Sequence, residues 1–235
     1  MRGAPMDDST EHDDGGVVWQ FDDQVPDEAD RDVDYQRERF VGTRRRILEA
    51  AARVLRDKGY AGARLSDIAA LVRMRTASLY YYFESKETLA KEVFRVGTRT
   101  AIVHVGHELD RLGDDADAEA RLAAAIRAHL HVHLGRSGVF GGAMIRVLGQ
   151  APADVRERHL VLERDYADLW RRLLEDAVKA EIVRDDVDLS ALRMLLMGSL
   201  NWTSEWFAPG RLTVDQLADT AVDLVFGGIR ALPRS

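Results

Sequence analysis

From residue 43 onward, apolar residues recur at the spacing of amphipathic α-helices. Thr43 suits the N-cap of the first helix, and Gly59 suits a left-handed stop at its C-terminal end. Two shorter helices are predicted after it, over 66–72 and 76–83. The apolar positions that define the inner side of the first helix are Ile47, Leu48, Ala51, Val54 and Leu55.

The rest of the chain keeps the helical period. Ser85 is a good N-cap for a long helix that ends near Leu109. No segment shows the alternation of a β-strand, and no internal repeat is found. The sequence therefore predicts an all-α protein. The further predicted helices cover residues 118–134, 143–150, 153–180, 189–207 and 213–232.

Residues 1–35 show no such period and contain twelve Asp and Glu against two Arg. This composition cannot bury enough apolar surface to offset the entropy of ordering, so a disordered acidic tail is predicted. Residues 36–90 contain twelve Lys and Arg against six Asp and Glu, although the whole chain has a formal charge of −7. One basic block in an acidic chain favours a surface that contacts nucleic acid.

Several classes of protein are disfavoured by what the sequence lacks. The absence of cysteine excludes disulfides, thiolate catalysis and cysteine-based zinc sites. No apolar run reaches the ~18 residues of a membrane span, and no secretory signal is apparent, so a cytoplasmic protein is predicted. Without a recognisable catalytic motif, we expect neither enzymatic activity nor a cofactor. His129 and His133 share one helix face, which leaves a helical metal-binding protein or enzyme as an alternative.

The three short helices have the lengths and tight joints of a helix-turn-helix, in which a second helix braces a third that enters the major groove of DNA. Leu79 and Phe83 are expected to pack inward. The arginine and hydroxyl groups left outside suit phosphate oxygens and base edges. Residues 36–90 are therefore expected to form a DNA-binding domain, followed by a larger domain over 91–235.

These residues resemble the TetR family of bacterial transcriptional regulators. The resemblance lies in Ile47–Gly59 and above all in Leu79–Phe83, followed by Ser85–Glu87. By position, the resemblance implies phosphate contacts for Tyr80, Tyr82 and Lys86, and it places Arg75, Thr76, Ala77 and Tyr81 on the groove. The DNA-contact residues expected from the residues and the resemblance together are Arg44, Arg64, Arg75, Thr76, Ala77, Ser78, Tyr80, Tyr81, Tyr82 and Lys86.

The chain departs from the family at the turn between the second and third helices. Arg73 stands where the family usually has glycine, so the turn either avoids positive φ or adopts it with strain. Arg64 stands where a capping Ser or Thr is common, which removes the cap and adds a cation near DNA. Arg75 adds a side chain that can bind guanine with two hydrogen bonds.

The resemblance also implies a homodimer with a ligand pocket in the larger domain. Trp170 and the segment 201–210 are similar to the subgroup that controls fatty-acid and steroid breakdown and answers to acyl-CoA thioesters. Residues 189–207 and 213–232 are the expected dimer helices, with Trp202 and Trp206 at the interface or the pocket edge. The expected pocket residues are Phe140, Met144, Leu148, Tyr166, Trp170 and Met197, with Arg146, Arg164 and Arg171 as candidates for an anionic group.

Together these features predict a repressor that binds a palindromic operator in double-stranded DNA and is released by a small hydrophobic or acyl-CoA effector. The long helix over 86–109 is the expected coupling element, because it joins both domains. An activator, or a regulator that binds DNA without any effector, is the alternative within the same fold.

Overall fold

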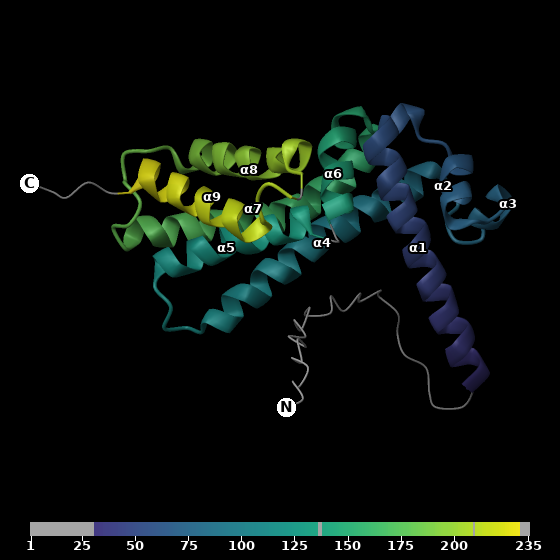
Figure 1. Cartoon of the computed structure of the whole chain (residues 1–235), viewed down its shortest axis with the longest axis horizontal. Coiled ribbons are helices and arrows are strands. Elements are labelled where there is room, and N and C mark those ends of the chain that lie inside the picture. The colour runs from purple at the N-terminus through teal and green to yellow at the C-terminus, as the bar shows by residue number, and fades with distance from the viewer. Residues whose placement is uncertain (1–30, 136–137, 209, 231–235) are drawn as a thin grey trace, which may run out of the picture. The chain divides into compact units, whose positions relative to one another are not determined.

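The computed structural model describes residues 31–135, 138–208 and 210–230, and nearly all of them are helical (Figure 1). Within these ranges the only β-type pairing is an isolated bridge between Val183 and Arg230. The predicted all-α fold is therefore confirmed. The helices are α1 (Arg31–Gly62), α2 (Leu65–Val72), α3 (Thr76–Leu79), α4 (Lys86–Leu112), α5 (Ala118–Leu134), α6 (Gly138–Val147), the 3-10 turn η1 (Leu148–Gln150), α7 (Ala153–Lys179), α8 (Leu189–Trp206) and α9 (Val214–Ile229).

Helix α1 begins at Arg31, so Thr43 is an interior residue and its predicted role as N-cap is wrong. The added turns are polar but contain good helix formers such as Gln, Glu and Arg, which an apolar period does not detect. Residues 31–35 of the predicted tail are thus helical, and the tail before them lies outside the described residues. Gly59 adopts φ 68°, as predicted for a stop, and one further turn follows it.

Helices α1, α2 and α3 enclose a small core that includes Ile68, Leu79 and Phe83. Helix α3 is shorter than the predicted 76–83, because residues Tyr80–Tyr82 form a turn instead of continuing the helix. The chain must then reach Ser85, which is extended at φ −154° and caps α4 by accepting a hydrogen bond from the amide of Thr88. The predicted cap at Ser85 is confirmed.

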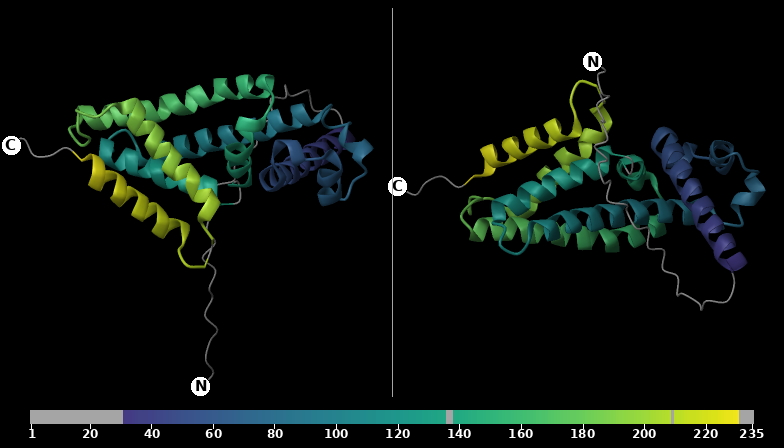
Figure 2. Two further views of the ribbon diagram at one scale, coloured as in Figure 1. Left: turned by 90° about the horizontal axis from the view of Figure 1, so that it is seen from above. Right: turned by 60° about the horizontal axis from the view of Figure 1, so that its bottom comes forward.

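Helices α4 to α9 pack around Trp170, whose side chain is fully buried. Helix α4 contacts α5, α6 and α7, whereas α8 and α9 both pack against α5 (Figure 2). The side chains of Asp117, Asp188 and Thr213 accept hydrogen bonds from the first turns of α5, α8 and α9 and so fix where these helices begin. None of the described helices is both long and apolar enough to cross a bilayer.

Helix α6 begins at Gly138, five residues before the helix predicted over 143–150, in a segment rich in glycine. Its glycines serve close packing rather than a loop, because a Cβ atom at Gly141 would lie 2.4 Å from the His133 ring and one at Gly142 would lie 3.1 Å from Arg56. Helix α6 thereby fits between α1 on one side and α4, α5 and α8 on the others.

Candidate DNA-binding surface and ligand pocket

The turn between α2 and α3 keeps the left-handed conformation although glycine is absent. Arg73 has φ 57° and ψ 45°, and its amide donates to the carbonyl oxygen of Ala70 at 3.2 Å. Of the two alternatives predicted for this position, the turn with strain is the one observed. A side chain in this region costs roughly 1–2 kcal/mol relative to an ordinary conformation.

Eight of the ten predicted DNA-contact residues are exposed or half-buried on α3, its flanking turns and the start of α2. Tyr81 is the most open of the three tyrosines, with 76% of its surface exposed. Arg64 does not cap α2 with its side chain, so its guanidinium is free of that role. The exposed members are Arg64, Arg75, Ala77, Tyr80 and Tyr81, and the half-buried members are Thr76, Ser78 and Tyr82.

Two of these tyrosines pack against the early part of α1. The Phe40 ring stacks on Tyr82 with 5.0 Å between centroids and meets the edge of Tyr81 at 5.8 Å. Tyr81 and Tyr82 also meet edge to face at 5.1 Å. The sequence analysis missed Phe40, because it placed the start of the helix after this residue. Phe40 thus restricts the orientation of two predicted contact residues.

The other two predicted contact residues are engaged inside the domain. The Arg44 guanidinium lies 4.6 Å from the centre of the Phe83 ring and 3.7 Å from the Glu92 carboxylate. The Lys86 ammonium donates to the backbone oxygens of Tyr60 and Ala63 at 2.9 and 3.3 Å, which caps the last turn of α1. Contact of either side chain with DNA remains a prediction that competes with these bonds.

A hydroxyl–carboxylate pair joins the same helix ends. The Tyr60 hydroxyl donates to Glu87 at 3.0 Å. Burial, reinforced by this bond, raises the pKa of Tyr60, whereas hydrogen bonds at the N-terminal end of α4 lower the pKa of Glu87. Together with Lys86, this pair forms a clasp between the end of α1 and the start of α4.

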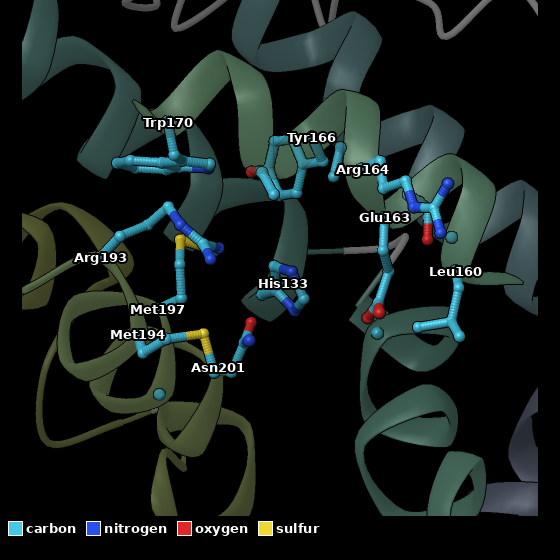
Figure 3. Close-up of a pocket in the computed structure, with 16 residues that line it drawn as sticks. His133, Leu160, Glu163, Arg164, Tyr166, Trp170, Arg193, Met194, Met197 and Asn201 are labelled. Carbon is cyan, nitrogen blue, oxygen red and sulfur yellow. The ribbon is translucent and has the colours of Figure 1, made fainter. Parts of the chain in front are cut away.

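A cavity of about 430 Å³ lies among α4, α5, α6, α7 and α8 (Figure 3). Its apolar wall includes Ala101, Leu160 and two methionines, Met194 and Met197. Of the predicted ligand residues, Tyr166, Trp170 and Met197 line this cavity. The described residues that line it are Gly97, Thr98, Ala101, His133, Gly141, Leu160, Glu163, Arg164, Tyr166, Ala167, Trp170, Arg193, Met194, Met197, Gly198 and Asn201.

Two of the other predicted ligand residues, Phe140 and Leu148, are not on this wall. Phe140 is buried against Gly97 of α4, and Leu148 lies in the 3-10 turn after α6. The side chain of Met144 lies outside what the structure describes, as does that of Arg146.

Two arginines reach the cavity. Arg164 lines it, whereas Arg171 is ion-paired with Asp168 on the same helix. Arg193, which the sequence analysis did not single out, points toward the middle of the cavity (Figure 3). Among the described residues no hydrogen-bonding or ion-pair partner is found for its guanidinium. No periodicity in the sequence marks Arg193, because its orientation depends on how α8 packs.

A polar network borders the cavity from behind. The ring of His129 is fully buried, with Nδ1 2.7 Å from the Tyr166 hydroxyl and Nε2 3.1 Å from Oδ1 of Asn201. Burial and the neighbouring His133 keep the pKa of His129 far below its usual value, and burial lowers the pKa of His133 to about 4. Burial also raises the pKa of Tyr166. At neutral pH all these side chains are uncharged.

His129 and His133 do share one face, as their spacing predicted, and their rings lie 4.1 Å apart. Their environment is not that of a metal site. In the part of the chain that the structure describes, no three His, Asp or Glu side chains come close enough to hold a metal ion.

Comparison with known proteins agrees with this arrangement. Residues 47–93 match the bacterial regulatory proteins of the tetR family, and residues 115–229 match the C-terminal domain of tetracyclin repressor-like proteins. The chain belongs to the TetR family of DNA-binding transcriptional regulators.

Among its relatives is the HTH-type transcriptional repressor KstR2 of Rhodococcus jostii, with 26% identity over 80% of this chain and 91% of the relative. The crystal structure of AibR in complex with isovaleryl coenzyme A and operator DNA is 30% identical and covers 78% of this chain and 98% of its own, with a TM-score of 0.66. KstR2 of Mycobacterium tuberculosis shares the fold at a TM-score of 0.71, 20% identity, and coverage of 80% and 95%.

Proposed function

We propose that the protein is a homodimeric repressor that leaves its operator when an acyl-CoA thioester enters the cavity. The observation that carries this proposal is the cavity itself, where an apolar wall surrounds the unpaired guanidinium of Arg193. An acyl chain matches the wall, and a phosphate or other anionic group of coenzyme A matches the cation. The protein would act by binding, in the cytoplasm where its operator lies.

The DNA-binding side of the proposal rests on the exposed residues around α3. Arg75 and Tyr81 would face the groove, and Tyr80 and Arg64 would contact phosphates. Residues 36–90 would form the DNA-binding domain that carries them. Thr76, Ala77, Ser78 and Tyr82 complete this surface. Because Arg44 and Lys86 already have partners within the domain, they would act mainly by holding it together.

The dimer side rests on an apolar surface that the protomer leaves open. Leu195 and Trp202 on α8 are 74% and 60% exposed, and Leu224 on α9 is similarly open. Met194 and Trp206 extend the same kind of surface along α8. Exposed apolar side chains of this size on two neighbouring segments of the chain favour an interface, and an operator with two half-sites requires two recognition helices. The segments 189–207 and 213–232 would therefore form the twofold interface.

The relatives support the effector class. AibR binds isovaleryl coenzyme A and operator DNA, by the description of its structure, and it matches this chain across both regions. The cavity volume falls within the range of about 300–1,000 Å³ that is usual for small-molecule sites.

Coupling between cavity and DNA would run through two helices that belong to both. Gly97 and Ala101 of α4 line the cavity, and the first turn of α4 forms the clasp with α1. Gly141 of α6 also lines the cavity, whereas the adjacent Gly142 contacts Arg56 of α1. An effector would release DNA only if it bound more tightly to a state that fits the operator less well.

The test uses the full chain and a labelled fragment from upstream of its own gene. Fluorescence anisotropy should show sequence-specific binding, and isovaleryl-CoA or octanoyl-CoA, but not coenzyme A or free octanoate, should release the fragment. Arg193→Ala should need roughly tenfold more acyl-CoA for release while binding DNA normally. The exposed Arg172 of α7, changed to Ala, is the matched control. Failure to bind any upstream fragment specifically at low salt would overturn the proposal.

A further inference from the structure

The His129 network places hydrogen-bonding groups beside the cavity, whose lining also includes the charged side chains of Glu163, Arg164 and Arg193. Tyr166 and Asn201 both line the cavity and both bind the buried imidazole of His129 behind it. The three side chains come from α7, α8 and α5, so the network forms only in the folded domain. A buried polar network of this kind is costly unless each group has a partner.

The donors and acceptors of the network do not balance. A neutral imidazole has one N–H and one acceptor nitrogen. If the Tyr166 hydroxyl donates to Nδ1, then Nε2–H donates to Oδ1 of Asn201, and both N–H groups of that amide are left without an acceptor. In the other tautomer, Nδ1–H donates to the Tyr166 hydroxyl oxygen, and the Asn201 amide is flipped so that its N–H donates to Nε2. The hydroxyl proton of Tyr166 is then left without an acceptor in this network. Either arrangement leaves a donor at the cavity wall.

Trp170 adds a second donor at the same wall. Its indole nitrogen is buried and has no partner with good hydrogen-bond geometry among the described residues, although it lies close enough to the Tyr166 hydroxyl to oppose the rise in that group's pKa. In Figure 3 this nitrogen lies on the side of the ring that faces Tyr166. An unmet buried N–H is unfavourable in the empty protein, and a ligand oxygen would relieve it.

The network offers no positive charge to match an anion. Burial keeps the pKa of both His129 and His133 low, so both rings are neutral at physiological pH. A carboxylate placed beside them would lose its hydration without gaining an ion pair from them. Of the two arginines among the described lining residues, Arg164 and Arg193, it is Arg193 to which the anionic part of the effector is assigned under the proposed function.

From these donors we propose that the cavity wall formed by Tyr166, Trp170 and Asn201 binds an uncharged carbonyl oxygen of the effector. This inference rests on the proposed function, because it concerns the same cavity. Two carbonyls could serve, namely that of the thioester itself or a keto group within the acyl chain. A wall that is built to hydrogen-bond an oxygen discriminates strongly against a ligand that lacks it, because its donors are then left unmet.

The test compares ligands of one chain length by titration calorimetry with the full protein. The probes are octanoyl-CoA, its thioether analogue S-octyl-CoA, and the two keto thioesters 3-oxooctanoyl-CoA and 7-oxooctanoyl-CoA. Loss of roughly tenfold in affinity for S-octyl-CoA relative to octanoyl-CoA would assign the site to the thioester carbonyl. A similar gain for either keto thioester over octanoyl-CoA would assign it to a chain carbonyl. Equal affinities, within twofold, for all four probes would overturn the inference.

Two variants separate recognition from a structural role. Trp170→Phe and Asn201→Leu should each weaken binding of the preferred carbonyl ligand by roughly five- to tenfold and leave S-octyl-CoA almost unchanged. Equal loss for every probe would mean that the side chains only shape the cavity, against the inference. Were no probe to bind the wild type while operator binding persisted, the effector class in the proposed function would fail first, and this inference with it.

Discussion

In the helix-turn-helix region, the cations nearest the core have partners within the protein, whereas in the pocket they do not. Arg44 lies on the Phe83 ring beside Glu92, and Lys86 is bonded to the end of α1. Arg193 has no such partner among the described residues, and the indole N–H of Trp170 is unmet. The first region uses its buried polar groups to hold a fixed shape, and the second leaves them for a ligand. Substitutions in the two regions should therefore have different consequences.

The largest expected effect comes from the core of the first region. Leu79→Ala removes a fully buried side chain beneath the exposed face of α3 and should cost about 2–5 kcal/mol of unfolding free energy. Arg75→Ala removes an exposed side chain just before α3, one that makes no capping hydrogen bond, and should leave stability within about 0.5 kcal/mol while weakening operator binding. Urea unfolding and anisotropy measure the two quantities. Equal stability losses would contradict the division between core and contact face.

Lowering the pH should destabilise the protein through the buried histidines beside the pocket. His129 and His133 have lowered pKa values in the folded state, so the unfolded chain binds more protons below about pH 6.5. Their contribution to stability is present above pH 6.5 and is lost as the pH falls toward 4, by about 3 kcal/mol for a group shifted as far as His133. Melting temperature against pH should therefore fall less steeply for His133→Gln than for the wild type. Parallel curves for the two proteins would show that His133 does not cause the acid sensitivity.

Gly141 tests how tightly α6 must pack against the pocket. Alanine there would place a Cβ atom 2.4 Å from Nδ1 of His133, so the ring or the helix must shift. Overpacking of this kind costs about 1–3 kcal/mol and should reduce effector affinity more than operator affinity. Gly106→Ala in α4 has nothing within 4 Å of the new atom and should stabilise by about 0.5–1 kcal/mol. A stable Gly141→Ala protein with unchanged ligand binding would contradict the close packing.

The smallest expected effect is a gain in the first region. Arg73→Gly should relieve the left-handed strain and raise the unfolding free energy by up to about 1 kcal/mol, since glycine also gains entropy in the unfolded chain. Arg53 is exposed within α1, and Arg53→Gly should instead destabilise by about 1 kcal/mol. Shifts of the urea midpoint in opposite directions would support the strain at Arg73, and a loss in both variants would refute it.

Sequence patterns located most helices because each buries one apolar stripe, and local chemistry located the stops and caps at Gly59 and Ser85. The start of α1 was not predicted, because its first turns are polar and show no apolar residues at helical spacing. The first half of α6 was also missed, because its glycines suggest a break in isolation and are explained only by the proximity of His133 and Arg56. For α6 the missing information was a neighbour distant in sequence.

The pocket was less predictable than the DNA-binding surface. Tyr166, Trp170 and Met197 were identified because large or adaptable side chains on inward helices tend to border cavities. Arg193 and Asn201 were not, because their orientation into the cavity depends on the rotation of α8 against its neighbours. The shared face of His129 and His133 was noticed, with a metal site only as an alternative, but the hydrogen bond between His129 and Tyr166 was not foreseen.

The clasp ties the start of α4 to the end of α1, so the two helices should move together at this point. Gly97, on the cavity wall, is eleven residues beyond Lys86, so about 16 Å of continuous helix separates them. A tilt of about 5° pivoting near Gly97 would displace the clasped end by about 1.5 Å. Because Tyr60, Glu87 and Lys86 tie that end to α1, the movement would be transmitted to the helix-turn-helix region as a whole.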